Sequence, residues 1–179
     1  RREPTDLVAL LRRAVADHGA AAGRRPLRLD VEEESLVGQW DPVGLGRVLD
    51  NLVSNAIKYS PDSPDAEITL GLRLVDGAAV LRVRDRGHGI PEGEQARVFE
   101  RFYRGANAGD TPGTGLGLAA ALQVVEALGG SLTLSSREGD GAEFAVTLPL
   151  DTPDGAESDG AESDGAESDG AAPGTAAAG

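Results

Sequence analysis

Apolar residues in this chain repeat with two different periods, and these periods alternate along residues 1–150. Spacings of three and four predict helices at 7–15 (ending near Gly19), 42–59, 92–99 and 118–128. Alternation predicts strands at 27–31, 36–40 (a short partner of 27–31), 67–75, 78–84, 132–134 and 144–148. Asp41-Pro42 predicts the start of the second helix, and Asp76-Gly77 predicts a hairpin between the strands 67–75 and 78–84. Such a chain must bury one side of a sheet under helices. We therefore predict an α+β fold, a two-layer α/β sandwich with a mixed, mainly antiparallel sheet and helices on one face.

Residues 151–179 differ from the rest. They contain eight acidic residues and no Lys or Arg, so without them the formal net charge changes from −13 to −5. The segment Gly-Ala-Glu-Ser-Asp begins at Gly155 and is repeated at Gly160 and Gly165. A charged, glycine-rich repeat cannot offset its ordering entropy by burial. We predict a folded domain at 1–150 and a disordered acidic tail at 151–179; the alternative is an acidic docking tail.

Composition excludes several classes of protein. The chain has no cysteine, which rules out disulfides and thiolate metal sites. No apolar run approaches the roughly 18 residues of a membrane helix. Lys and Arg do not cluster as a nucleic-acid surface requires. We expect no nucleic-acid partner and no membrane-embedded segment in these residues.

One face of the predicted helix 42–59 is polar. Its side chains, at spacings of four, four and three residues, are Arg47, Asn51, Asn55 and Lys58. An Asn carbonyl oxygen can bind Mg²⁺ without adding negative charge beside a polyphosphate, and Lys58 can bring an ammonium group near the phosphates. The alternative is an ordinary solvated face.

A second candidate follows the predicted strand 78–84. Leu81 and Val83 point to one face of that strand, and Asp85 continues the same face. A buried carboxylate needs a hydrogen-bond donor, and the exocyclic amine of adenine is one. Gly87 and Gly89 allow a tight turn and close approach to a base. The alternative is a hairpin turn with a surface aspartate.

The third candidate is the glycine-rich segment 113–118, which opens the predicted helix 118–128. Free N–H groups and the positive end of the dipole at a helix N-terminus favour phosphate. The glycine spacing differs from the Rossmann fingerprint, and the Gly-Lys-Ser/Thr of a Walker P-loop is missing. Alone, this segment is a weak predictor.

Together these segments resemble the sequence boxes of bacterial sensor histidine kinases, in the same order. Residues 49–61 (LDNLVSNAIKYSP) resemble the N box, 85–91 (DRGHGIP) the first glycine box, 98–104 (VFERFYR) the F box and 113–118 (GTGLGL) the second glycine box. The resemblance covers residues 1–150. It implies the Bergerat ATP-binding fold, shared with gyrase, Hsp90 and MutL-type ATPases.

The resemblance also implies a role for each matching residue. Asn55 would be the main Mg²⁺ ligand, and Asn51 would assist it and contact phosphate. Lys58 and Tyr59 would line the phosphate and sugar side, and Asp85 would bind the adenine amine. The other residues implied to shape the ATP site are Gly87, Gly89, Ile90, Gly113, Thr114, Gly115, Leu116, Gly117 and Leu118.

Residues 104–114 would form a mobile ATP lid. Phe99 and Phe102 would anchor this lid in the core rather than contact the nucleotide. His88 occupies a variable position of the first glycine box, and we assign it no catalytic role.

Position 51 separates two reactions within this superfamily. The ATPase relatives carry a Glu there, four residues before the Mg²⁺-binding Asn, and it activates water for hydrolysis. An amide cannot act as a general base, so Asn51 favours phosphoryl transfer, which depends mainly on positioning and charge neutralisation. Two alternatives stay open: a GHKL-type ATPase, and a nucleotide-dependent regulatory module similar to the anti-sigma-factor kinases.

The phosphoacceptor of a complete sensor kinase is a His on a dimerisation domain, which then serves a response regulator. Neither His18 nor His88 matches the acceptor motif. We therefore expect this chain to bind Mg²⁺-ATP and to phosphorylate only a His-bearing domain from the same or a partner polypeptide. The resemblance further implies a homodimeric full-length kinase, a cytoplasmic location for these residues, and a membrane anchor, where one exists, in other segments.

Overall fold

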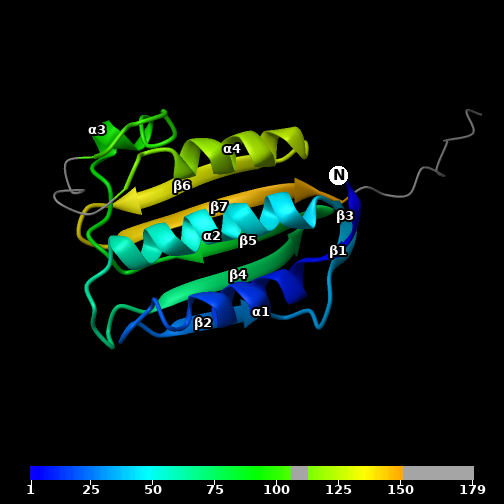
Figure 1. The fold of residues 1–179 in the computed structure, drawn as a ribbon, viewed down its shortest axis with the longest axis horizontal. Helices are drawn as coiled ribbons and strands as arrows, with labels where there is room; N and C mark the ends of the chain where they lie inside the picture. The colour runs from blue at the N-terminus through cyan, green and yellow to red at the C-terminus, as the bar shows by residue number, and fades with distance from the viewer. Residues whose placement is uncertain (106–112, 151–179) are drawn as a thin grey trace, which may run out of the picture.

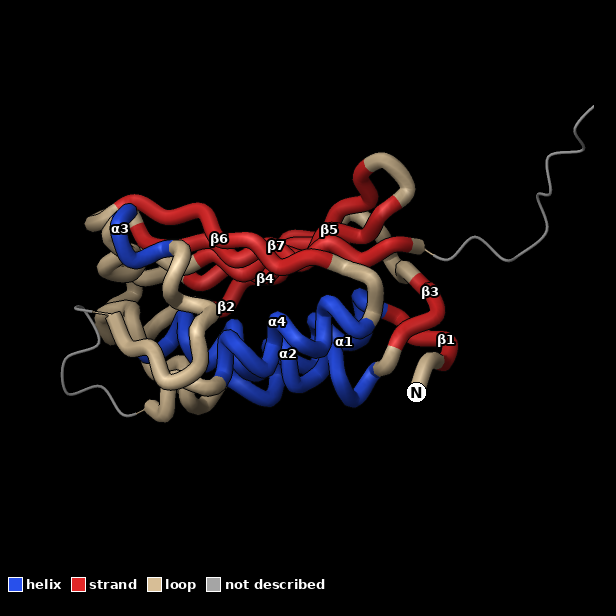
Figure 2. Tube along the Cα trace, turned by 90° about the horizontal axis from the view of Figure 1, so that it is seen from above, coloured by secondary structure: helices blue, strands red, loops and turns tan. Residues whose placement is uncertain are grey.

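The computed structural model describes residues 1–105 and 113–150, which form two layers. The sheet makes one layer, and α1 (Leu7–His18), α2 (Pro42–Lys58) and α4 (Gly117–Ala127) lie together on one of its faces (Figure 2). Buried apolar residues from all three helices and from the facing side of the strands form a single core between the layers. The predicted two-layer α/β sandwich is confirmed.

Both long N-terminal helices begin at a capping aspartate. The Asp6 carboxylate accepts a hydrogen bond from the Val8 N–H at 3.0 Å, and Asp41 accepts one from Val43 at 3.1 Å. These bonds satisfy N–H groups that have no partner inside the helix. Pro42 occupies the first turn of α2, as the sequence predicts. The residues of α2 that are buried in the core are Leu45, Val48, Leu49, Leu52, Val53 and Ala56.

The main sheet has the strand order β2-β4-β5-β7-β6 (Figure 1). Its strands are β2 (Leu27–Val31), β4 (Ile68–Val75), β5 (Ala78–Arg84), β6 (Ser131–Arg137) and β7 (Gly141–Pro149). Only the β2–β4 pair is parallel among the described strand pairs of this sheet. Asp76 and Gly77, which join β4 to β5, both have positive φ, as the predicted tight hairpin requires.

A second, two-stranded sheet lies at the N-terminal end of the fold. It pairs β1 (Glu3–Asp6) with β3 (Val37–Trp40) in antiparallel register. The prediction that residues 36–40 pair with 27–31 is therefore wrong. The Trp40 side chain gives the reason, since it is buried and its indole N–H donates to the Pro149 carbonyl at 3.2 Å. That contact fixes β3 beside the end of β7 rather than along β2.

The short helix α3 (Glu92–Gln95) is shorter than the predicted 92–99. Beyond it the backbone continues in tighter turns, with Arg97 N–H bonded to the Glu94 carbonyl and Glu100 N–H to the Arg97 carbonyl, both at 2.9 Å. This three-residue spacing is that of 3₁₀ geometry. The predicted location is right, but the extent of α-helix is not.

Residues 106–112 and 151–179 lie outside the described residues. They hold the predicted acidic tail and most of the predicted lid at 104–114, so both stay predictions, as does the domain boundary at residue 150. Among the helices that the structure describes, none has the length and apolar character needed to cross a membrane.

Candidate functional site

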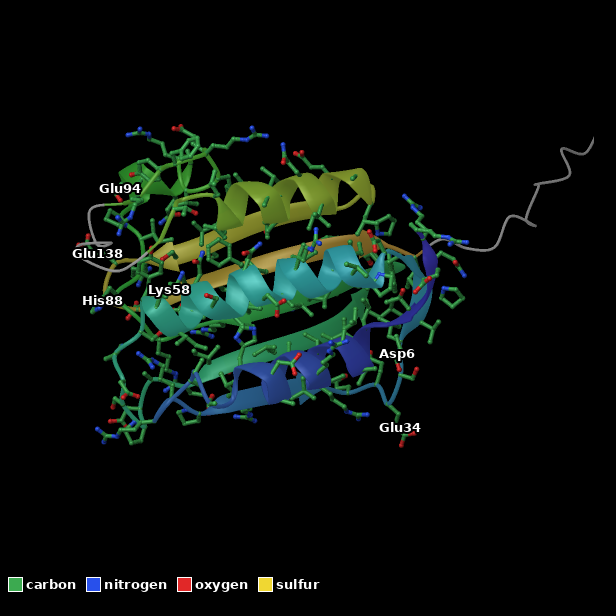
Figure 3. The ribbon with its side chains drawn as sticks, viewed as in Figure 1. Asp6, Glu34, Lys58, His88, Glu94 and Glu138 are labelled. Carbon is green, nitrogen blue, oxygen red and sulfur yellow. The ribbon has the colours of Figure 1, made fainter. Side chains whose placement is uncertain are left out.

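A cavity lies at the end of the molecule where α2 ends and α4 begins. Lys58 lies at this end, together with His88 and Glu94 (Figure 3). The predicted site residues that line the cavity are Asn51, Asn55, Lys58, Tyr59, Gly89, Ile90, Gly113, Thr114, Gly115, Gly117 and Leu118. Three segments far apart in the sequence thus meet around one cavity.

The polar face of α2 borders the start of α4 directly. A Cβ placed on Gly117 would lie 3.1 Å from the Asn51 Oδ1, and one on Gly113 would lie 4.0 Å from the Lys58 Nζ. The N-terminus of a helix carries a partial positive charge. The site therefore combines an ammonium group, a helix N-terminus and neutral amide oxygens, which together suit a polyanion with a bound divalent cation.

Position 115 requires glycine because the backbone of Phe102 lies too close for a side chain. Gly115 has a φ of +70°, and a Cβ there would lie 2.7 Å from the carbonyl carbon of Phe102. The Gly115 carbonyl also accepts a hydrogen bond from the Phe102 N–H at 2.9 Å. The contact joins the glycine-rich segment to the end of segment 98–104. The neighbouring Leu116 is 37% exposed and does not line the cavity.

Asp85 is buried at the end of β5, as the strand register predicts, with 6% of its surface exposed. Its Oδ1 accepts hydrogen bonds from the Gly87 N–H at 2.8 Å and the Ala142 N–H at 3.3 Å. Burial raises the pKa of this carboxyl, although the two hydrogen bonds act in the opposite direction. No donor among the described residues bonds to Oδ2, so the carboxylate keeps acceptor capacity for a ligand.

Asp85 and Gly87 do not line the cavity in this structure. The space beside Gly87 is already filled, because a Cβ there would lie 2.2 Å from the Tyr59 carbonyl oxygen and 2.9 Å from the Asp85 Oδ1. Gly89 and Ile90, from the same segment, do line it. Segment 85–91 therefore contributes Gly89 and Ile90 to the cavity wall. The Asp85 carboxylate lies behind this wall, bonded to the Gly87 N–H.

Several cavity residues were missed by the sequence reasoning: Ser54, Pro91, Glu94, Val98, Tyr103 and Phe144. Ser54 could have been found, because it lies one helical turn after Asn51. Phe144 was identified only as an apolar strand residue. Nothing in the sequence pointed to Glu94, since a carboxylate is unexpected beside a polyphosphate.

The two phenylalanines of segment 98–104 differ in their environments. Phe99 packs against Phe144 edge to face, with ring centroids 6.2 Å apart, which agrees with an anchoring role. Phe102 has 72% of its surface exposed and a φ of +63°, so the prediction that it packs in the core is wrong. The chain reverses at Phe102 to make its bond to Gly115, and this reversal leaves the ring outside the core.

Tyr103 and Glu94 form a polar cluster at the cavity edge. The Arg97 guanidinium lies 4.5 Å from the centroid of the Tyr103 ring. Partial burial and the adjacent Glu94 carboxylate raise the pKa of the Tyr103 hydroxyl.

The cavity contains residues that could bind a metal ion only together with other ligands. Within residues 1–105 and 113–150, no group of three or more His, Cys, Asp or Glu side chains could hold a metal by itself. Mg²⁺ is usually held by few protein ligands together with water and substrate phosphates. Asn51 and Asn55 line the cavity, and their side-chain carbonyl oxygens are groups of the kind that this pattern of ligation uses.

The sequence pattern of the histidine kinase-, DNA gyrase B- and HSP90-like ATPase family matches residues 40–152. A similar protein is the signal transduction histidine-protein kinase/phosphatase MprB of Mycolicibacterium vanbaalenii, 43% identical over 136 residues, which are 73% of this chain. The matched part is 26% of that relative, so the chain spans about a quarter of its length.

Solved structures with the same fold include a mycobacterial sensor histidine kinase MprB, 32% identical with a TM-score of 0.73 over 84% of this chain and 98% of that one. Full-length ShkA in complex with AMPPNP is 27% identical, with a TM-score of 0.71 over 83% of this chain and 31% of that one. On the extent of the family match, this chain belongs to the histidine kinase-, DNA gyrase B- and HSP90-like ATPase family.

Proposed function

We propose that this chain is the catalytic domain of a sensor histidine kinase. It binds Mg²⁺-ATP in the cavity between α2 and α4 and donates the γ-phosphate to a His on a separate dimerisation domain. A response regulator is the next phosphate acceptor. The names of the similar proteins support the kinase class, and the AMPPNP complex of ShkA supports a nucleotide in the cavity.

The observation that carries this proposal is the amide of Asn51 beside the start of α4. Hydrolysis needs a group that removes a proton from water, and an amide cannot do so. Phosphoryl transfer needs the phosphates held in position and their charge neutralised. Lys58 and the N-terminus of α4 supply positive charge, and a Mg²⁺ ion, when bound at Asn51 and Asn55, would neutralise further phosphate charge.

The remaining residues of the cavity would orient the nucleotide. Asp85 would accept a hydrogen bond from the adenine amine through Oδ2, with Oδ1 fixed by the Gly87 and Ala142 N–H groups. Ile90 and Leu118 offer apolar surface to the base. Tyr59 and the segment 113–117 would border the sugar and phosphates.

Binding is tested with Asn55→Asp. A carboxylate at this position would face the phosphates, and like charges brought together cost several kcal/mol. We expect the affinity for Mg²⁺-ATP to fall about 100-fold, measured by calorimetry. Val43→Asp is the matched control, since it adds the same charge at a 64% exposed position of the same helix. Equal affinity of Asn55→Asp and the wild-type chain would remove Asn55 from the site.

Transfer is tested by mixing the chain with the purified dimerisation domain of a similar kinase and ATP labelled on the γ-phosphate. Label on a His of that domain supports the proposed kinase, and nucleotide binding without label supports a regulatory module similar to the anti-sigma-factor kinases. Steady phosphate release that Glu94→Gln abolishes would support an ATPase instead, with the Glu94 carboxylate as the base in place of position 51.

A further inference from the structure

The face of the sheet opposite the helices has an unusual charge pattern. The helices α1, α2 and α4 all lie on the other face of the sheet (Figure 2). A hollow on this face is lined by five arginines and three carboxylates. The arginines, which define what we call the arginine hollow, are Arg28, Arg73, Arg82, Arg84 and Arg86.

Strand register explains why these side chains converge. Thr69 is paired with Arg28 on one side and with Arg84 on the other, so the two arginines flank a small residue. Gly71, paired with Arg82, has no side chain at all, and a Cβ there would lie 3.9 Å from that of Arg82. The small residues Thr69 and Gly71 lie on β4, between β2 and β5, and they leave the space that the longer arginine side chains surround.

Nearby carboxylates pair with three of the five arginines of the hollow. Arg73 lies 3.0 Å from Asp30 and 3.4 Å from Glu32. Arg82 lies 3.6 Å from Glu143, and Arg28 lies 4.0 Å from Glu67. Arg84 and Arg86 are exposed, and neither has an ion-pair partner among the residues that the structure describes. The hollow thus keeps two arginines available for further carboxylates, on a chain whose formal net charge is −13.

The opposite charge lies in residues 151–179. All eight acidic residues of this segment fall between positions 151 and 169, and the three repeats at 155–169 present six of them at regular intervals. No Lys or Arg interrupts them. The segment follows directly on β7, the strand paired with β5, which carries Arg82 and Arg84.

The distance is short enough for contact within one chain. Arg84 is paired with Glu143, six residues before Pro149, which is about 20 Å along a strand at about 3.4 Å per residue. In general, ten residues of flexible chain have a typical end-to-end distance of about 17 Å and an extended length of about 34 Å. A chain of the length of 150–159 can therefore span the distance, and the later repeats have still more chain available.

We propose that the acidic repeats in residues 155–169 bind intramolecularly to the arginine hollow. Single exposed ion pairs contribute little, but the three repeats offer equivalent partners in several registers. Attachment to the same chain also keeps their effective concentration high. The contact is electrostatic, and any of the three repeats can make it. It lies on the face of the sheet opposite the helices, so it leaves the cavity between α2 and α4 open.

The test uses the absence of cysteine, because Ser158→Cys gives the full chain a single thiol for a nitroxide label. In about 0.1 M salt we expect the label to broaden the amide NMR signals around Gly71 and Arg84 more than those of the outer side of α1. In about 1 M NaCl, where the screening length is about 3 Å, the broadening should be lost. Reduction of the nitroxide supplies the reference spectrum.

Two double variants distinguish the effect of charge in the arginine hollow from the effect of the net charge of the chain. Arg28→Glu with Arg84→Glu should abolish the broadening, whereas Arg12→Glu with Arg13→Glu, the same charge change on α1, should leave it. Broadening that is strongest around the cavity, or that is equal over all faces, overturns the proposal. So does broadening that appears only between a labelled chain and a second, unlabelled chain. ATP affinity is a separate measurement, so failure here leaves the proposed function untouched.

Discussion

Two aspartates lie at strand ends at opposite ends of the molecule: Asp6 is the last residue of β1, and Asp85 directly follows β5. Both accept backbone hydrogen bonds, yet their environments differ. Asp6 lies at the end away from Lys58 and His88 (Figure 3). It caps α1 and also accepts hydrogen bonds from the Leu36 N–H at 3.1 Å and the Ser35 hydroxyl at 3.0 Å. Asp85 is more deeply buried and has two donors, both on one oxygen.

The pKa values of the two carboxyls move in opposite directions. Burial alone would raise the pKa of Asp6, but the hydrogen bonds from Leu36, Ser35 and Val8 together hold it below its usual range. Burial raises the pKa of Asp85 in spite of its two hydrogen bonds. The ionised form of Asp6 is therefore favoured by folding and that of Asp85 is disfavoured. A carboxylate kept buried with an unused oxygen is better explained by a ligand than by stability.

Of the changes to these two aspartates, Asp85→Asn has the largest expected effect. If Asp85 accepts the adenine amine, the variant loses a hydrogen bond to a charged group, which contributes about 1.5–3 kcal/mol. We expect ATP affinity to fall about 10- to 100-fold and the preference for ATP over GTP to decrease, both measured by calorimetry. The free energy of unfolding at neutral pH should not fall, because the amide removes a buried charge.

Asp140→Asn is the control for this prediction, since it removes one carboxylate from an exposed turn near the same end of β7. It should change neither nucleotide affinity nor unfolding. If Asp85→Asn instead unfolded the chain while ATP still bound at the wild-type affinity, Asp85 would be a structural residue like Asp6 and the contrast would disappear.

Asp6→Ala should have a smaller effect, and it should lower stability rather than nucleotide affinity. The loss of a helix cap costs about 1–2 kcal/mol of unfolding free energy, measured by denaturant titration, while ATP affinity stays unchanged. Asp17→Ala is the comparison, because Asp17 lies in an exposed ion pair with Arg13 that contributes little. Equal stability of the two variants would show that the three hydrogen bonds of Asp6 contribute no more than the exposed ion pair of Asp17 with Arg13.

Local sequence signals were enough to locate most of the fold. The stripe in α2, its start at Asp41-Pro42 and the hairpin at Asp76-Gly77 depend only on neighbouring residues, and all three are confirmed. The pairing of β3 with β1 was not predictable in this way. It depends on the contact of Trp40 with Pro149, more than a hundred residues away in the sequence.

The same distinction applies to the candidate site. Three cavity residues, Asn51, Asn55 and Lys58, follow from the spacing that puts them on one face of a helix. The burial of Asp85, beside the cavity wall, follows from the alternation of a strand. Glu94 lies in the single turn of α3 and Tyr103 lies in the turns after it, and no apolar periodicity places either side chain at the cavity. Phe102 was misplaced for the same reason, since its position follows from the backbone bond to Gly115.

The smallest expected effect is a difference in pH dependence, and it tests the comparison most directly. The folded pKa of Asp6 is below the ordinary 3.8, so its contribution to stability is present above 3.8 and is lost as the pH falls through the folded pKa. The folded pKa of Asp85 is above 3.8, so its contribution is present below 3.8 and is lost as the pH rises through the folded pKa.

Unfolding free energies of the wild-type chain, Asp6→Asn and Asp85→Asn, measured at several pH values on both sides of 3.8, should therefore diverge. Toward acid pH, the advantage of the wild type over Asp6→Asn should shrink, and its stability relative to Asp85→Asn should increase. All other carboxyls are shared by the three chains, so their titration cancels in each difference. Because the signs are opposite, a general effect of acid on the fold cannot imitate this result. Differences that change in the same direction would mean that Asp85, like Asp6, is stabilised by folding in its ionised form.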